Sequence, residues 1–198
     1  MISISWIKKD GPVSRLGYAL FETAIGASAI AWHAQDPGHE VVLIQLPEAD
    51  AEATRRRVLR RLPGAGEEDP PPAIGEAIAG ITALLRGEKA DLSTVRLDMS
   101  QVPPFHRRVF EAARAIPAGT TRTYGEIAAL VGEPGAAQAV GQALGANPFA
   151  PVIPCHRVLA AGGRMNGFSA HGGIATKRRM LEIEGALARQ LDLFERAS

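Results

Sequence analysis

The chain has 198 residues, with 22 Lys and Arg against 21 Asp and Glu, and a net charge of +1 at pH 7. One cysteine excludes an intramolecular disulfide, and no apolar run approaches the roughly 18 to 20 residues that span a bilayer. The five histidines form no close cluster of zinc ligands with that cysteine, and residues 1–10 lack the apolar centre of a signal peptide. We therefore expect a cytoplasmic protein without a metal, a cofactor or a membrane partner.

The two halves of the chain differ in charge. Residues 1–100 carry 11 Lys and Arg and 14 Asp and Glu, a net charge of −3, whereas residues 101–198 carry 11 and 7, a net charge of +4. The positive surplus lies in the half that holds the cysteine. It is compatible with a nucleic-acid partner but too small to identify one.

The first hundred residues predict a small antiparallel sheet with helices. The expected elements, in chain order, are strands at 17–25, 27–33 and 40–46, a helix at 48–61, a loop at 63–72, a helix at 73–86 and a segment at 94–99 that could return to the sheet. The five arginines of the first helix are interpreted as a solvated face rather than a nucleic-acid patch. Since no catalytic pattern occurs here, we interpret residues 1–100 as a support domain.

The second half predicts a helix-turn-helix, a frequent DNA-reading unit, after a first helix at 105–116. Thr123 and Glu126 have the spacing of a capping box and predict a helix at 124–131. A turn at 132–135 and a helix at 136–144 follow. Small side chains at Ala136 and Ala137 would let the helix backbone approach a phosphate, or they merely pack tightly.

The lone cysteine, Cys155, ends an apolar run at 149–153 that we expect to be extended. It is followed directly by His156 and Arg157, and positive neighbours favour the thiolate, which is the nucleophilic form of cysteine. The sequence therefore predicts a nucleophile at this position. The alternative is an inert thiol, because free cysteine is among the most often buried residues.

Two features lie beyond the cysteine. A glycine-rich loop encloses Phe168 and Ser169, and it could wrap a flat ligand or simply be mobile. The last helix, expected at 176–184, has Lys177 in its first turn and Glu184 in its last, so both charges oppose the helix dipole. Such a double violation of a local rule indicates that these side chains have a role elsewhere.

These motifs, spaced and ordered as they are, resemble the O6-alkylguanine-DNA alkyltransferases over residues 105–185. The resemblance rests on Pro-Cys-His-Arg-Val at 154–158, Asn-Pro at 147–148, Thr-Tyr at 123–124, Ala-Ala at 136–137, Phe-Ser at 168–169 and Glu-Gly at 184–185. It implies an α+β fold with two domains. A small N-terminal antiparallel sheet with helices in a ribonuclease H-like layout would occupy residues 1–100, and a helical, winged-helix-like domain with the helix-turn-helix residues 101–198.

The resemblance also implies a reaction, in which the alkyl group on O6 of guanine moves to the cysteine once per protein molecule. Glu184 would orient His156, which would polarise Cys155 through a water, while Asn147 holds the local backbone. Tyr124 would give a proton to the departing guanine. The base itself would be held by the main chain at Cys155 and Val158 and by Ser169, with Phe168 beside it.

The implied partner is double-stranded DNA that contains O6-alkylguanine, bound by a monomer that flips the damaged nucleotide out of the stack. The residues expected to contact this DNA are Thr123, Ala136, Ala137, Gln138 and Arg157. The sequence departs from the family at Gln138, where an arginine usually fills the space left by the flipped base. We therefore expect weaker DNA binding or less effective flipping than in relatives.

Three alternatives remain. A cysteine hydrolase would need a direct thiol-imidazole pair, which is hard to form if Cys155 and His156 point to opposite faces of an extended run. An alkyltransferase-like lesion sensor shares the architecture but lacks the reactive cysteine. A plain helix-turn-helix transcription factor would need neither the thiol nor Glu184.

Overall fold

The structure is a computed structural model that describes residues 15–35 and 38–187. Its N-terminal half contains a four-stranded sheet with the strand order β3-β2-β1-β4. The strands are β1 (Leu16–Thr23), β2 (Gly26–His33), β3 (Val41–Gln45) and β4 (Gly66–Glu67). The three predicted strands are confirmed within two residues at most ends, and β1, β2 and β3 pair antiparallel as expected.

One prediction for this sheet is corrected. The fourth strand lies inside the predicted loop at 63–72 and pairs parallel to β1, so the sheet is mixed. A two-residue strand leaves no periodicity from which it could be predicted. Residues 94–99 return to the sheet as expected, although they form no continuous strand. One isolated parallel bridge joins Leu97 to Val41, where the Val41 amide donates to the Arg96 carbonyl and the Asp98 amide donates to the Val41 carbonyl, both at 2.8 Å.

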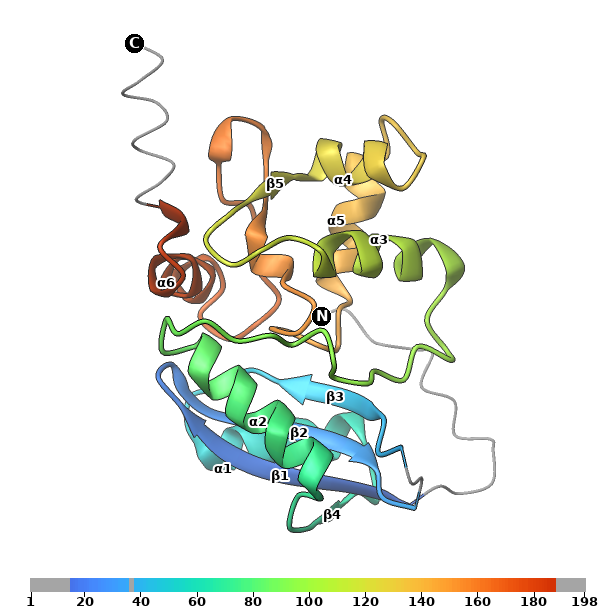
Figure 1. Ribbon diagram of the computed structural model, residues 1–198, viewed down its shortest axis with the longest axis vertical. Coiled ribbons are helices and arrows are strands. Elements are labelled where there is room, and N and C mark those ends of the chain that lie inside the picture. Colours follow the sequence, from blue (N-terminus) through green and yellow to red (C-terminus); the bar gives the residue numbers. More distant parts are fainter. Residues whose placement is uncertain (1–14, 36–37, 188–198) are drawn as a thin grey trace.

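Two helices cover opposite faces of the sheet (Figure 1). Helix α1 (Ala51–Arg61) packs through Val58 against one face, and α2 (Pro72–Leu84) packs through Ile81 against the other. Asp50 caps α1 by accepting a hydrogen bond from the Ala53 amide at 2.6 Å. The two faces are separately apolar because alternate residues of a strand point to opposite sides.

The C-terminal half is mainly helical (Figure 1). Its helices are α3 (Pro104–Arg114), α4 (Tyr124–Leu130), α5 (Ala137–Gly145) and α6 (Ile174–Ile183). All four were predicted, and the capping box of Thr123 and Glu126 is present at the start of α4. Two short strands, β5 (Arg122–Thr123) and β6 (Val158–Leu159), pair parallel beside them. The mixed α+β class is confirmed.

The apolar run at 149–153 is a buried turn, and the prediction of an extended segment is wrong. The Ile153 amide donates to the Phe149 carbonyl at 3.0 Å, and the Ala150–Pro151 peptide bond is cis. Periodicity cannot distinguish a short buried strand from a short buried turn, since both are continuously apolar.

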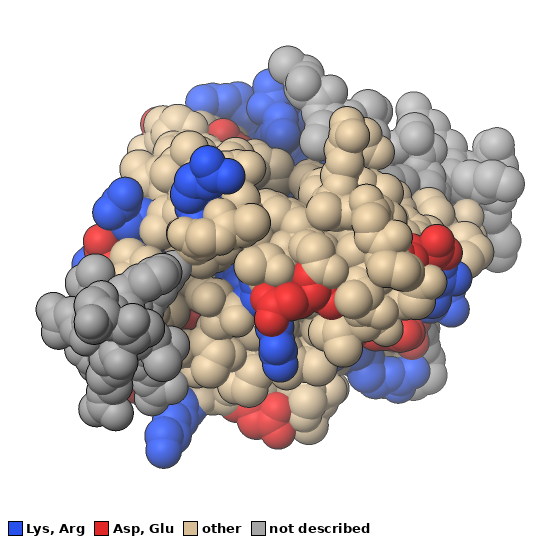
Figure 2. All heavy atoms as spheres, turned by 90° about the horizontal axis from the view of Figure 1, so that it is seen from above, with Lys and Arg blue, Asp and Glu red and all other residues tan. Residues whose placement is uncertain are grey.

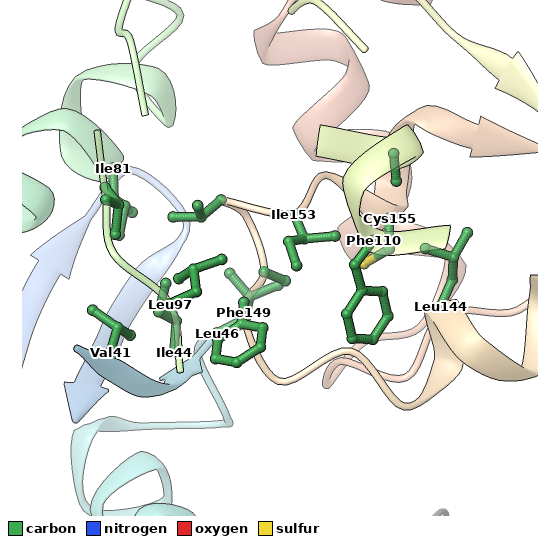
Figure 3. Close-up of a cluster of buried hydrophobic side chains, with 14 of the residues drawn as sticks. Val41, Ile44, Leu46, Ile81, Leu97, Phe110, Leu144, Phe149, Ile153 and Cys155 are labelled. Atoms are coloured by element: carbon green, nitrogen blue, oxygen red, sulfur yellow. The ribbon is translucent and has the colours of Figure 1, made fainter. Parts of the chain in front are cut away.

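One hydrophobic core runs through both halves of the chain. Its buried members include Ile44 of β3 and Phe110 of α3, and Figure 3 shows Phe149 and Ile153 lying between β3 and Cys155. The Ile44 amide also donates to the Pro148 carbonyl at 2.8 Å. The core thus crosses the domain boundary expected near residue 100. No helix within the described ranges is long and apolar enough to cross a membrane.

Replacing Phe149 with alanine is expected to lower the free energy of unfolding by about 3–5 kcal/mol, because the ring is 1% exposed and its removal leaves a cavity between the two halves. Urea denaturation followed by circular dichroism measures this change. Leu130→Ala is the control, since Leu130 is 64% exposed and its removal should change the free energy by less than about 0.5 kcal/mol. Similar small effects for both variants would contradict a shared core.

Candidate active site

Cys155 lies in the 3₁₀ turn η1 (Cys155–Arg157), between the buried turn at 149–153 and β6. Cys155 is 6% exposed to solvent. Successive side chains of a 3₁₀ turn are about 120° apart, so Cys155 and His156 do not point to opposite faces as an extended run would require. The argument from an extended run against a thiol-imidazole pair is therefore wrong. The imidazole is instead directed to Glu184.

The buried environment of the thiol determines its protonation. Burial raises the pKa of Cys155, while the side chain of Asn147 and the charge of Lys177 lower it to a smaller extent. The expectation that adjacent His156 and Arg157 favour the thiolate is corrected, because burial also lowers the pKa of His156 and Arg157 is paired with a carboxylate. The resting thiol is protonated and needs a base.

His156 and Glu184 form such a base. His156 Nε2 lies 2.9 Å from Glu184 Oε1, at the C-terminal end of α6. Burial acts to raise the pKa of Glu184, but hydrogen bonds from His156 and Arg157 lower it to about 2, so it is ionised. An ionised carboxylate only accepts, which places the proton of His156 on Nε2. Its Nδ1 is buried and makes no hydrogen bond within residues 15–35 and 38–187.

Asn147 ties together the turn that precedes the thiol. Its Nδ2 donates to the Ile153 carbonyl at 2.8 Å, and its Oδ1 accepts from the Phe149 amide at 2.9 Å. Both groups of the side chain are therefore used to fix the backbone between α5 and Cys155. A buried turn of this length has few ladder partners, so such side-chain bonds replace them.

A pocket of about 560 Å³ opens above the thiol. Six of the predicted site residues line it: Cys155, Tyr124, Ala137, Gln138, Phe168 and Ser169. Gly141 of α5 also lines the pocket, and a Cβ at this position would make an ordinary van der Waals contact with the Tyr124 ring, 3.8 Å from its Cε1. Burial raises the pKa of Tyr124, and so does the neighbouring Cys155, so the phenol remains a proton donor. Thr123, Ala136, Asn147, His156, Arg157, Val158 and Glu184 do not line the pocket.

Lys177 is a site residue for which the sequence indicates a tertiary role without assigning it to the active site. It is 1% exposed, lines the pocket, and donates from Nζ to the Val158 carbonyl at 2.7 Å. The ammonium also lies 5.7 Å from the centroid of the Tyr124 ring, within the range of a cation–π contact. The signal was its position near the start of a helix, where a positive charge opposes the dipole.

The helix-turn-helix lies beside the pocket. Thr123 uses its hydroxyl within the capping box, accepting from the Glu126 amide at 3.1 Å. Gln138 is exposed on the first turn of α5, which carries no charged residue. Seen from this end of the molecule, the charged side chains form small groups, several with basic and acidic residues side by side, on a largely uncharged surface (Figure 2). The face therefore offers shape and hydrogen bonds more than charge.

Arg157 is placed differently from the prediction. Its residue is 7% exposed, and its guanidinium donates to Glu184 and to the Ile116 carbonyl. A side chain so enclosed cannot reach a DNA backbone without breaking these bonds. The expectation of a DNA contact at Arg157 is corrected, because the sequence shows the neighbours of a residue but not its tertiary partner 27 positions away.

Comparisons with known proteins agree on one family. Residues 104–186 match the family model described as "6-O-methylguanine DNA methyltransferase, DNA binding domain". A methylated-DNA–protein-cysteine methyltransferase of Mycobacterium tuberculosis is 44% identical over 126 residues, which is 63% of this chain and 74% of that protein.

Solved structures extend the similarity to the N-terminal half. The M. tuberculosis protein OGT, in complex with DNA, superposes with a TM-score of 0.68 and 33% identity, covering 86% of this chain and 93% of that one. An O6-methylguanine-DNA methyltransferase from Pyrococcus kodakaraensis superposes with a TM-score of 0.63 and 25% identity, covering 86% and 99%.

Replacing Lys177 with methionine is expected to slow alkylation of Cys155 by iodoacetamide at neutral pH by about threefold or more, since the positive charge stabilises the thiolate. Losing that charge raises the pKa of the thiol, so the rate-against-pH curve should move to higher pH. Mass spectrometry of the modified protein gives the rates. Arg178→Met is the matched control, because Arg178 is exposed on the same helix. An unmoved curve, or an equal shift in the control, would contradict the role of Lys177.

Proposed function

The chain belongs to the family of methylated-DNA–protein-cysteine methyltransferases, and on this premise we propose that it repairs DNA by moving the alkyl group of an O6-alkylguanine onto Cys155. The observation that supports this most is a protonated thiol at the base of a pocket, with a histidine and a carboxylate behind it and a helix-turn-helix beside it. The partner is DNA that contains the damaged base.

The reaction begins with removal of the thiol proton. It passes through a bridging water to Nδ1 of His156, which is buried and available as an acceptor. The thiolate then attacks the alkyl carbon, so that an S–C bond forms as the C–O6 bond breaks. Guanine leaves with the electron pair of the C–O6 bond and takes a proton from the hydroxyl of Tyr124. His156 then gives the proton that it took from the thiol to the Tyr124 phenolate through water, so both side chains regain their starting protonation. Because the thioether product resists displacement of its thiolate, each molecule acts once.

The alkylated base must leave the stack to reach a buried thiol, which costs a few kcal/mol. Ala136 and Ala137 are half-buried and Gln138 is exposed. The two small side chains would allow close approach of the α5 backbone to the DNA, and Gln138 would occupy the space left by the base. The amino group of the flipped guanine would donate hydrogen bonds to the main-chain carbonyls of Cys155 and Val158. The Val158 carbonyl already accepts from Lys177, and its second lone pair stays available.

Incubation with duplex DNA carrying O6-[³H-methyl]guanine is expected to leave one label per protein molecule, located on Cys155 by peptide mass spectrometry. Cys155→Ala should retain none. A cysteine hydrolase would release the label and regain its free thiol, which would contradict the proposal. Tight lesion-selective binding by wild-type protein without label transfer would indicate a sensor instead.

Replacing Gln138 with arginine is expected to strengthen binding to the damaged duplex severalfold and to raise the transfer rate, because a guanidinium adds charge and stacking surface at the site of flipping. The slope of the logarithm of the binding constant against the logarithm of the salt concentration should steepen by about one, which corresponds to one more counterion released from the DNA. Single-turnover assays measure the transfer rate, and fluorescence anisotropy measures the binding affinity and its salt dependence.

Gln142→Arg is the matched control for this change. It adds the same charge one turn along α5, where Gln142 also lines the pocket. An equal gain in both variants would show general attraction to DNA, and no gain at position 138 would refute the role of that residue in flipping.

A further inference from the structure

Arg157 has no step of its own in the proposed reaction, yet it is bonded to the carboxylate that orients the base. We propose that Arg157 is a positioning residue that keeps His156 neutral and correctly aimed, by neutralising Glu184 and fixing the plane of its carboxylate. This inference rests on the proposed function, in which His156 accepts the thiol proton.

The geometry of the carboxylate is set mainly by the arginine. Glu184 Oε2 accepts from Arg157 Nε at 2.9 Å, and Oε1 accepts both from Nη2 at 2.8 Å and from His156 Nε2 at 2.9 Å. Two parallel bonds from a planar guanidinium define the orientation of a carboxylate as a single bond cannot. Oε1 is thereby held in position for the imidazole.

The guanidinium is itself anchored on the other side. Its Nη1 donates to the carbonyl of Ile116, just beyond the end of α3, at 2.5 Å. The arginine therefore joins α3, the 3₁₀ turn of the thiol and the C-terminal end of α6. Because contacts with three segments fix the guanidinium, the position of Glu184 does not depend on α6 alone.

The charged groups around His156 determine whether its imidazole stays neutral. The ionisable groups that face it are Glu184 and Lys177 from α6 and Arg157 and Cys155 from the turn. An isolated carboxylate beside an imidazole stabilises the imidazolium, which cannot accept the proton of a thiol. Burial is the largest influence and lowers the pKa of His156, and the positive charges of Arg157 and Lys177 act in the same direction, against the effect of Glu184. With Arg157 paired, Glu184 orients the ring without protonating it.

Single-turnover transfer rates of the full chain from pH 5.5 to 9 test this role. In Arg157→Met the acid limb of the profile should move to higher pH, and the rate at pH 6 relative to pH 8.5 should fall by about five- to tenfold, because His156 becomes protonated. Arg157→Lys keeps the positive charge but loses the two parallel hydrogen bonds of the guanidinium. The acid limb of its pH profile should therefore stay near that of the wild type, while its maximal rate falls. Arg108→Met, which breaks the exposed pair with Glu133, is the control.

An acid limb in Arg157→Met that coincides with wild type would overturn the proposal, since a purely structural ion pair would lower stability without moving the profile. A lysine variant shifted as far as the methionine variant would also overturn it.

A second measurement does not require transfer or a folded methionine variant. ¹⁵N NMR of wild-type protein at pH 7, with His156 assigned by its loss in His156→Gln, should show a neutral ring protonated on Nε2. An imidazolium would overturn the role of Arg157. If no label is ever transferred, the proposed function fails while this spectrum still decides the protonation of His156.

Discussion

Burial of the thiol is the constraint to which the rest of the site responds. Burial raises the pKa of the Cys155 thiol, so contact with a substrate is not by itself enough to make it a nucleophile. It needs a base that is also buried, and that base must stay neutral beside the carboxylate that orients it. His156, Glu184 and Arg157 therefore form one unit, in which each group sets the protonation of the next. Lys177 completes it by favouring the thiolate as it forms.

The N-terminal half contributes to this unit through packing. The edge strand β3 donates a backbone hydrogen bond to Pro148, and its apolar side chains contact the turn that precedes the thiol. Protein interiors are packed at nearly crystalline density, so a displacement of β3 would be transmitted to Cys155. A half without catalytic residues thus fixes the position of the nucleophile.

Much of this arrangement could be predicted from local pattern. The helices follow from apolar periodicity and from one capping box, and the positions of Lys177 and Glu184 against the helix dipole indicated a tertiary role that the structure confirms as buried contacts. The failures had tertiary causes. The charge next to Cys155 predicted a thiolate and a DNA-binding Arg157, because no local pattern reveals that the arginine meets Glu184 inside the protein. The turn at 149–153 was misread as extended because a buried turn and a buried strand are equally apolar.

The proposed function implies an unusual division of binding energy. Two exposed arginines that are paired with residues of the helix-turn-helix are partly neutralised, Arg122 by Glu126 and Arg108 by Glu133, and α5 carries no charge. Counterion release, which normally supplies most non-specific affinity for DNA, is then limited at this face. The free energy that holds a flipped base must come instead from the pocket, where aromatic side chains stack on a base whatever its sequence context. Two aromatic residues line that pocket, Tyr124 from α4 and Phe168 from the glycine-rich loop. Damage recognition would accordingly rest on whether a base fits this pocket more than on how tightly the surrounding duplex is held.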